Sequence, residues 1–516
     1  MSAPAIDRTS VDLRAGEFRA RDARAILCDD ARVTLDEAAR DGVERAAAVV
    51  AGIAAREASV YGVNTGFGKL AQTRIPREKL AELQRNLVVS HACGVGALLP
   101  RDVVRLILAL KINSLARGYS GIRWSVIETL LTCLQRDVLP AIPTQGSVGA
   151  SGDLAPLAHL SAALIGIGDA FADGRRMSAV DAFGSAGIAP LSLGPKEGLA
   201  LLNGTQVSTA LALRGLVAAE DVLAASLVAC ALTLEAALGS VTPFDPRIHA
   251  VRGHAAQSDV ASVLRRLVSG TEINESHREC GRVQDPYSLR CAPQVLGACL
   301  RTLRDCAAIL VDEANAVSDN PLVFADTGEV LSGGNFHAEP VALAADALAI
   351  ALAEIGNISE RRCALLIDPV FSQLPPFLAT DPGLESGYMI AQVTAAALAS
   401  ENKGRSFPAS VDTIPTSAGQ EDHVSMATHA AARLGDMARN AANIVAIELL
   451  SAARGIGFRR PLRTSDALEA VLAEITPAIA DRGDPYLSPE IERVAELVLG
   501  GRFTPLTADL FPTTRP

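Results

Sequence analysis

The sequence has few aromatic residues, and it has no run of basic residues. Phe, Trp and Tyr make up 4% of the 516 residues, whereas 49% are hydrophobic. Ala and Leu must therefore build most of the core, which favours close helix packing over β-sheets. The formal charge is −11, so the chain lacks the positive surface that nucleic acids and anionic membranes attract. We expect neither of them as a partner.

Long uncharged segments and cysteine motifs are also missing. No uncharged stretch reaches the roughly 18 residues of a membrane-spanning helix, and the start, MSAPAIDRTSVDLRAG, has no apolar signal segment. The nine cysteines are scattered without a CxxC pair, which is typical of reduced thiols rather than of a disulfide framework or a zinc site. These absences predict a cytoplasmic protein.

Helical patterns dominate what is present. Residues 205–238 carry few charges and no proline, as a buried helix would. Similar helical patterns cover residues 293–317, 340–366, 387–401 and 421–453. We predict a mainly α protein, an elongated bundle of long helices with a smaller N-terminal region that carries a reactive loop. The expected division is an N-terminal region over residues 1–200, the bundle over 201–455 and short helices over 456–516.

That loop has the sequence GSVGASGDLAPLAHL, residues 146–160. In a tight bend, the nitrogen of Gly152 can attack the carbonyl carbon of Ala150, because glycine leaves its nitrogen uncrowded. Loss of one water closes a five-membered ring, and loss of a second from Ser151 leaves an exocyclic methylene. The product, 4-methylidene-imidazol-5-one, is an electrophile that no standard side chain supplies. Taken alone, Ala-Ser-Gly favours an ordinary turn before a helix over a reactive loop.

Seven further sequence blocks, taken together with the loop, resemble the aromatic amino acid ammonia-lyases, and they favour the reactive loop over an ordinary turn. They occur in the family's order over about residues 61–426. The blocks are VYGVNTGFGKL (60–70), LQRNLVVSHACGVG (83–96), ALKINSLARGYSGIR (109–123), GLALLNGTQ (198–206), VQDPYSLRC (283–291), SGGNFHAEPVA (332–342) and TSAGQEDHVSM (416–426).

The resemblance implies an activity, a cofactor and an assembly. The activity is the non-oxidative elimination of ammonia from an aromatic amino acid, a small-molecule substrate. The cofactor is the methylidene-imidazolone formed from Ala150, Ser151 and Gly152, with no external cofactor. The assembly is a homotetramer in which each site is built from more than one subunit.

Two tyrosines match family residues that handle protons. By resemblance, Tyr61 is the base that removes the β-proton. A free tyrosine has a pKa of about 10, so work as a phenolate near pH 8 needs a shift of about two units, or roughly 3 kcal/mol. Tyr287 resembles a second tyrosine that moves a proton or holds the electrophile. A tyrosine packed in a loop is the structural alternative for Tyr61.

Four residues match substrate-binding positions. Arg290 resembles a carboxylate clamp, in keeping with the bidentate pairs that guanidinium makes. Gln284 and Tyr287 precede it by six and three residues, which predicts one helical face. Asn203 matches an asparagine that contacts the electrophile or the substrate carboxylate, and Phe336 is expected to pack on the substrate ring. The structural alternatives are an ion pair for Arg290, a turn for Asn203 and ordinary core packing for Phe336.

Ser90-His91 and Glu421 bear on substrate choice. Relatives specific for phenylalanine or tyrosine carry Phe-Leu or His-Leu at the first position, and phenylalanine-specific relatives lack the carboxylate. A histidine and a carboxylate can pair the two nitrogens of an imidazole or hold the amine, so we expect L-histidine to be preferred. Gly419 and Ala292 depart from the family's pattern near the expected site.

Several alternatives stay open. A tyrosine or phenylalanine ammonia-lyase or an aminomutase would use the same chemistry, and the electrophile could bond to the substrate amine or to its ring. A lyase of the fumarase type would carry a GSSxMPxKxN loop, which the sequence lacks, and an inactive structural protein would not need the reactive loop. We expect no metal site, because eight histidines are dispersed and His337 with Glu339 is too short a pair.

Overall fold

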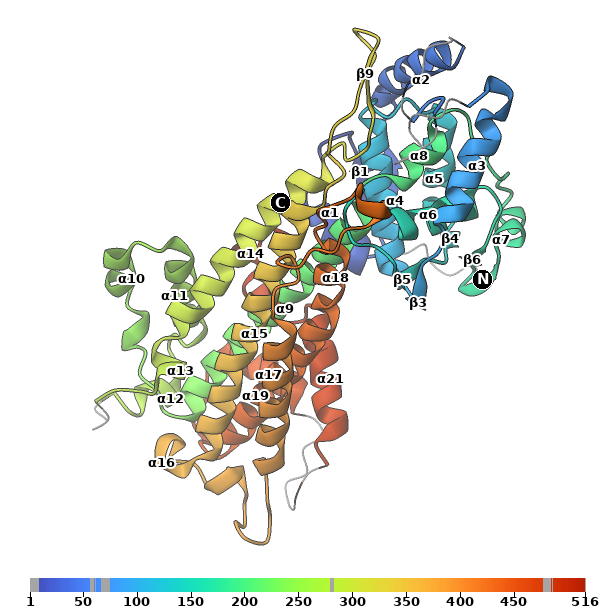
Figure 1. The fold of residues 1–516 in the computed structure, drawn as a ribbon. Helices are drawn as coiled ribbons and strands as arrows, with labels where there is room; N and C mark the ends of the chain where they lie inside the picture. Colours follow the sequence, from blue (N-terminus) through green and yellow to red (C-terminus); the bar gives the residue numbers. More distant parts are fainter. Residues whose placement is uncertain are drawn as a thin grey trace, which may run out of the picture. The chain divides into compact units, whose positions relative to one another are not determined.

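The chain folds into two compact units, each gathered from three segments. The computed structural model describes residues 9–55, 60, 62–65, 75–278, 283–476, 484 and 486–515. Unit 1 comprises Met1–Arg214, Ala307–Asp346 and Pro408–Ala432, and unit 2 comprises Gly215–Cys306, Ala347–Phe407 and Arg433–Pro516. Three of the five boundaries fall inside long helices, α9 (Gln206–Ala236), α14 (Ala292–Ala314) and α15 (Glu339–Ile367), which Figure 1 labels.

Unit 1 is organised around α4 (Arg101–Ala116), which is buried at every residue from Val103 onward. Packing on all sides explains why its apolar residues show no single stripe. α1 (Ala20–Cys28) and α5 (Trp124–Gln135) pack against it. The other helices of this unit are α2 (Arg40–Ala54), α3 (Leu80–His91), α6 (Leu154–Leu164), α7 (Ala179–Ser185), α8 (Glu197–Leu202) and α18 (Ala427–Ala432).

The strands described in unit 1 are short and form four small sheets. β1 (Ser10–Leu13) pairs in parallel with β2 (Arg32–Leu35), and the other strand pairs among the described residues are antiparallel. The others are β3 (Val95–Leu98) with β5 (Pro143–Gln145), β4 (Leu139–Pro140) with β6 (Asp169–Ala172), β6 with β7 (Arg175–Ser178), and β8 (Leu322–Phe324) with β9 (Glu329–Leu331). The sheets connect helices rather than form a core.

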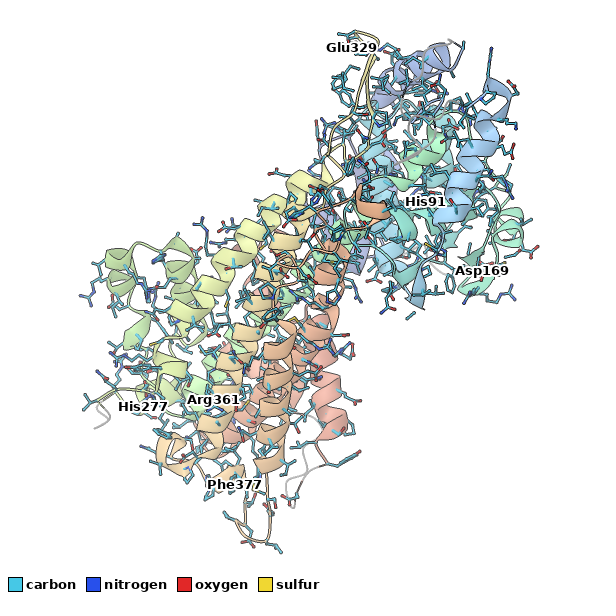
Figure 2. The ribbon with its side chains drawn as sticks, viewed as in Figure 1. His91, Asp169, His277, Glu329, Arg361 and Phe377 are labelled. Atoms are coloured by element: carbon cyan, nitrogen blue, oxygen red, sulfur yellow. The ribbon has the colours of Figure 1, made fainter. Side chains whose placement is uncertain are left out.

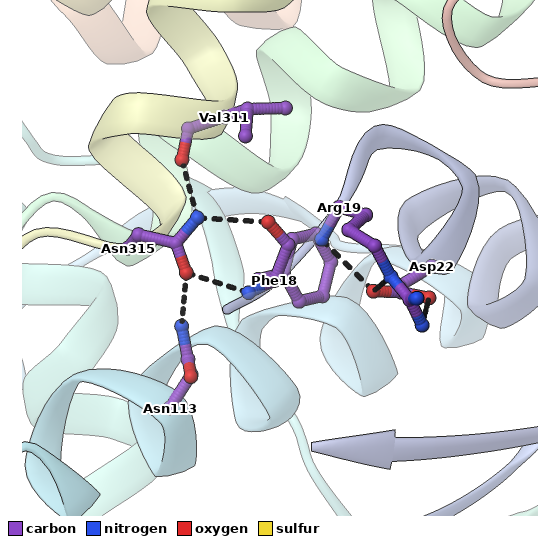
Figure 3. A network of polar contacts seen from close by, with 6 residues as sticks. All are labelled: Phe18, Arg19, Asp22, Asn113, Val311 and Asn315. Carbon is purple, nitrogen blue, oxygen red and sulfur yellow. Dashed lines mark hydrogen bonds and ion pairs between the residues drawn. The ribbon is translucent and has the colours of Figure 1, made fainter. Parts of the chain in front are cut away.

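Asn315 ties three separate segments of unit 1 together (Figure 3). Its Oδ1 accepts from the Phe18 amide at 2.6 Å and from Asn113 Nδ2 at 3.2 Å, and its Nδ2 donates to the Phe18 carbonyl at 2.8 Å. Nδ2 also donates to Val311 O at 2.9 Å. One amide therefore satisfies backbone groups just before α1 and fixes that segment to α4 and α14.

Unit 2 is a bundle of long helices. α17 (Met389–Arg405) and α21 (Ser488–Leu499) both pack on α19 (Leu434–Gly457), and α15 runs beside them (Figure 1). Shorter helices complete the unit: α10 (Pro246–Arg252), α11 (Ala255–Leu267), α12 (Glu272–Glu275), α13 (Tyr287–Arg290), α16 (Pro369–Ser372) and α20 (Asp466–Ile475). The mainly α fold class is confirmed.

Within the described part of the chain, two helices are long and apolar enough to cross a membrane by length and composition, α9 and α15. Within the most apolar window of each, 94% of the α9 residues and 72% of the α15 residues are buried inside the structure. Both helices are buried as core helices are, because most of their apolar surface is already covered by protein.

The predicted helix over residues 421–453 is wrong at its start. Residues 421–426 are not helical, and helix begins at Ala427 in α18 and resumes at Leu434 in α19. Glu421 instead forms a bridge with Thr416, and Met426 has a φ of 57°. A residue in the left-handed region cannot continue a right-handed helix, so the apolar pattern extends further than the helix does.

Candidate active site

The Ala-Ser-Gly loop lies immediately before α6, and glycine is required at its third position. Gly152 has a φ of +73°, and a Cβ built there would lie 2.3 Å from the carbonyl oxygen of Gly204. That oxygen accepts a hydrogen bond from the amide of Asp153 at 2.7 Å. The backbone of residues 152–153 is thus pressed against the residue after Asn203, an approach that any side chain would prevent.

Two distant segments brace the other end of the loop. The carbonyl of Gly149 accepts from the Ala338 amide and from Ser425 Oγ, both at 3.1 Å. The carbonyl of Val148 accepts from the Met426 amide at 2.8 Å. The loop is therefore fixed by hydrogen bonds at both ends while its central serine remains half-buried.

Ser151 donates a short hydrogen bond to Oε1 of Glu421. The other oxygen, Oε2, accepts from Thr416 Oγ1 at 2.5 Å and from Ser417 Oγ at 2.8 Å. Burial alone would raise the pKa of Glu421, but the hydrogen bonds from Ser151, Thr416 and Ser417, together with His91, lower it below its ordinary value. Glu421 is therefore an ionised carboxylate beside the loop.

Asn203, at the end of α8, holds the backbone of the same serine. Its Nδ2 donates to Ser151 O at 2.8 Å, and because a carbonyl only accepts, this contact sets the orientation of the amide. Its Oδ1 is then left buried, without a hydrogen-bond partner among the described residues. Asn203 thus offers a free acceptor beside the loop, which suits an amine rather than a carboxylate.

Lys111 stands behind Asn203 and was not singled out from the sequence. Its ammonium is buried in α4 and donates to the carbonyl of Asn203 at 2.7 Å and to Gln206 Oε1 at 3.5 Å. Burial lowers its pKa to about 7, although Asp319 and Asp153 oppose this. A lysine within the apolar run Leu106–Ile112 was the available signal, but only the fold shows that it contacts Asn203.

Asp153 was likewise given no role from the sequence. It is completely buried, and its carboxylate accepts from Ser147 Oγ at 2.9 Å, Thr428 Oγ1 at 2.6 Å, and both Ser208 N (2.7 Å) and Ser208 Oγ (2.9 Å). Four neutral donors satisfy the charge without a direct ion pair. Asp153 thereby anchors the residue that follows the loop.

His91 is the last residue of α3 and is half-buried (Figure 2). Its Nδ1 lies 2.8 Å from the carbonyl of Leu87, and since that carbonyl can only accept, Nδ1 carries the proton. In the neutral ring, Nε2 is then an acceptor. His91 belongs to the same unit as Glu421. Its protonated ring lowers the pKa of Glu421, which places the two side chains near each other, whereas its neutral ring offers Nε2 as an acceptor beside that carboxylate.

The remaining expected residues fall into three groups. Tyr61 lies outside the described residues. Phe336 is half-buried and stands two residues before Ala338, whose amide contacts the loop. Gln284, Tyr287 and Arg290 belong to unit 2, where the side chain of Tyr287 is exposed.

The predicted single helical face for Gln284, Tyr287 and Arg290 is wrong for Gln284. Helix α13 contains only Tyr287–Arg290, and residues 283–286 are not helical. Pro286 precedes the helix with a ψ of 152°. The residue before a proline is driven out of the helical region, so the helix cannot reach back to Gln284.

Comparisons with known proteins show the family of the chain. A family model described as aromatic amino acid lyase matches residues 18–477. Histidine ammonia-lyase of Aromatoleum aromaticum is 58% identical over 505 residues, which cover 97% of this chain and 96% of that protein. Histidine ammonia-lyase of Burkholderia pseudomallei is 58% identical over 498 residues, covering 96% of this chain and 98% of that protein.

Solved structures share the fold over nearly the whole chain. The crystal structure of histidine ammonia-lyase from Trypanosoma cruzi has a TM-score of 0.89 at 39% identity and covers 97% of this chain and 96% of that one. A tyrosine aminomutase from Streptomyces globisporus has a TM-score of 0.91 at 34% identity, covering 98% of this chain and 99% of that one.

Proposed function

The chain belongs to the aromatic amino acid lyase family, and from this premise we propose that it eliminates ammonia from L-histidine to give trans-urocanate, the first step of histidine degradation. The enzyme is an ammonia-lyase. The choice of histidine is supported by relatives named histidine ammonia-lyase at 58% identity over nearly the full length, against 34% for the tyrosine aminomutase.

One observation carries the proposal: Glu421 is an ionised carboxylate that holds Ser151, and His91 lies close enough to influence its charge. The acceptor Nε2 of His91 and the carboxylate of Glu421 are suited to the N–H groups of an imidazole or an amine. A pocket with buried groups that need polar partners disfavours the apolar ring of phenylalanine. Both residues therefore support a polar heteroaromatic substrate.

We further propose that Ala150, Ser151 and Gly152 form the methylidene-imidazolone by losing two waters. The bend is supported by the left-handed Gly152 and its close approach to Gly204. The hydrogen bond from Asn203 to Ser151 O would hold the carbonyl that becomes part of the ring. The group supplies the electrophile that amino-acid side chains lack.

The chain's own residues take the remaining roles in this proposal. Tyr61 removes the β-proton, Tyr287 moves the second proton or holds the loop, and Arg290 clamps the carboxylate. Gln284 contributes to binding near Arg290, and Phe336 packs on the ring. The free Oδ1 of Asn203 accepts from the substrate amine, which positions the group that leaves.

The proposed assembly is a cytoplasmic homotetramer in which each site takes residues from more than one subunit. It is supported by large apolar side chains on α15 and α17 that are more than half exposed, namely Ile350 (55%), Ile390 (60%) and Val393 (52%). Exposed apolar helix faces of this kind gain stability when another subunit covers them. Native mass spectrometry gives the number of subunits directly.

A substrate panel tests the function. Purified protein is incubated separately with L-histidine, L-tyrosine and L-phenylalanine, and the ultraviolet absorbance of a conjugated acid is followed together with ammonia release. Histidine should be turned over with the highest kcat/KM. Faster release from tyrosine, or formation of a β-amino acid without ammonia, would contradict the proposal and point to a lyase of another specificity or to an aminomutase.

A further inference from the structure

Three side chains that commonly bind metals meet beside the braced end of the reactive loop. His337, Glu339 and His423 each offer one ligand atom, and these atoms lie within 4.8 Å of one another. His337 and His423 are 86 residues apart in the chain. The sequence shows only the short pair His337 and Glu339, which is why no metal site was expected from it.

The hydrogen bond of His337 fixes which of its nitrogens can bind a cation. Its Nε2 lies 3.3 Å from the carbonyl oxygen of His423, and since that oxygen can only accept, Nε2 carries the proton. The neutral ring then presents a lone pair on Nδ1. Nδ1 lies 4.0 Å from Glu339 Oε2, too far for a hydrogen bond. Two electron-rich atoms therefore face each other across a gap.

Glu339 adds an independent observation. Its Oε2 is buried and has no hydrogen-bond partner among the described residues. The side chain as a whole is half-buried, but an oxygen atom that is shielded from water and has no partner costs free energy, which a paired donor or a metal ion removes. Glu339 also begins α15, where the helix dipole favours a negative charge. The dipole explains the acidic residue but gives its buried oxygen no partner.

His423 supplies a third ligand and an open side. Its ring centroid lies 5.6 Å from that of His337, and the rings are inclined by 45°. Two imidazoles bound to one tetrahedral Zn²⁺ at about 2.1 Å have centroids about 5 Å apart. Small side-chain rotations therefore suffice to place both rings on one ion. His423 is exposed to solvent, so a water molecule can occupy the fourth position.

We propose that His337, Glu339 and His423 bind a divalent transition-metal ion of the zinc type. Two histidines, one carboxylate and a water form a common tetrahedral zinc set, and imidazole nitrogens favour zinc and its neighbours over calcium or magnesium. The contact from His337 Nε2 to His423 O is the outer hydrogen bond that metal-binding histidines usually make. The dication also compensates the single carboxylate charge.

The ion joins the two segments that brace the reactive loop. Ala338, between two of the ligands, donates to Gly149 O. His423 lies between Glu421, which accepts from Ser151, and Met426, which donates to Val148 O. Metal binding therefore stabilises the native arrangement of the loop, because an ion that binds only the folded state raises the free energy of unfolding.

The test measures metal binding without substrate, since free histidine itself chelates zinc. Chelator-treated full-length protein is titrated with Zn²⁺ against a colorimetric zinc indicator, and Co²⁺ is used as a spectroscopic probe. We expect wild-type protein to bind one Zn²⁺ per chain more than either Glu339→Gln or His423→Ala. The Co²⁺ complex should show tetrahedral d–d bands without a sulfur-to-metal charge-transfer band, because the nine cysteines are the competing zinc ligands.

His254→Ala, which changes an exposed histidine of unit 2, is the matched control and should bind as wild type does. The two test variants change different segments, so circular dichroism and melting curves decide which of them folds and can be read. Equal zinc binding by wild type and a folded variant overturns the site, as does a cobalt spectrum with sulfur charge transfer. Neither result depends on turnover, so a failed metal site leaves the proposed reaction unaffected.

Discussion

Two buried carboxylates, one in each unit, show two ways to hold a charge inside a protein. Asp153 in unit 1 accepts four hydrogen bonds, all from hydroxyl groups or a backbone amide. Glu448 in unit 2 also accepts four, but two come from the buried guanidinium of Arg362, at 2.5 and 2.8 Å. Thr233 and Ser359 supply the other two, at 2.8 and 2.6 Å.

The difference in hydrogen-bond donors distinguishes a carboxylate beside the candidate active site, Asp153, from a carboxylate within the helix bundle, Glu448. Arg362 neutralises Glu448 within the helix bundle, which minimises the electrostatic influence of the pair on its surroundings. Neutral donors leave Asp153 with its negative charge next to Ser151, where it also acts on the pKa of Lys111. Asp153 therefore keeps its charge beside the reactive loop, whereas the charge of Glu448 is compensated between long helices.

Ser151→Ala gives the largest expected effect on activity and none on unit 2. Without the serine oxygen, no second water can be lost and the methylene cannot form, so turnover with histidine should fall to the background rate. The melting temperature should stay near that of wild type. Intact mass spectrometry is the direct measurement: wild-type protein should be two waters lighter than its sequence mass, and a full sequence mass in active protein would contradict the proposed group.

Glu448→Gln tests whether the ion pair between Arg362 and Glu448 stabilises the helix bundle of unit 2. It leaves the guanidinium of Arg362 buried beside a neutral amide, which should lower the free energy of unfolding by about 3–5 kcal/mol. Urea unfolding followed by circular dichroism measures the change. The double variant Arg362→Met with Glu448→Leu removes both charges and should regain most of the loss. If the double variant is no more stable than Glu448→Gln, the pairing of charges is not what stabilises this region.

His91→Phe tests specificity within unit 1. Loss of one hydrogen bond to the substrate ring should lower kcat/KM for histidine by about tenfold, while kcat/KM for phenylalanine should rise or stay constant. Steady-state kinetics with both amino acids give the ratio. His91→Gln retains a side-chain acceptor and should lie between the two proteins. An unchanged ratio in His91→Phe would remove this residue from substrate choice.

Lys111 and Glu235 should make the free energy of unfolding depend on pH in opposite directions. These effects should be smaller than those of the substitutions above. Burial lowers the pKa of Lys111 to about 7 and raises that of Glu235, in unit 2, to about 7. Between the folded pKa of Lys111 and its ordinary value of 10.5, only the unfolded chain binds the proton, so this lysine makes stability rise with pH. Between 4.5 and 7, only the folded chain protonates Glu235, so this glutamate makes stability fall as pH rises.

Urea midpoints at several pH values measure both effects. The stability of wild type relative to Lys111→Met should increase from pH 7 to pH 9. The stability of wild type relative to Glu235→Gln should decrease from pH 5 to pH 7. A flat difference for either variant would mean that the burial of that group is not reflected in its titration.

Sequence patterns predicted the long helices closely where the apolar periodicity and the end signals agree. The pattern over residues 340–366 corresponds to α15 (Glu339–Ile367), and that over 205–238 to α9 (Gln206–Ala236). The errors occur where a local backbone feature interrupts the pattern, at Met426 with its positive φ and at Pro286 before α13. Hydrophobic periodicity reports burial, which a loop residue can share with a helix.

The helical class, the small residues that allow Ala-Ser-Gly to bend, and the chemistry available at Ser151 and Glu421 all follow from the amino-acid sequence. Those properties depend on local composition and on the side chains themselves. The contact of Lys111 with Asn203, the neutral donors around Asp153, and the approach of His423 to His337 follow instead from packing. Such contacts join residues tens of positions apart, and their geometry follows from how whole helices pack rather than from any local pattern.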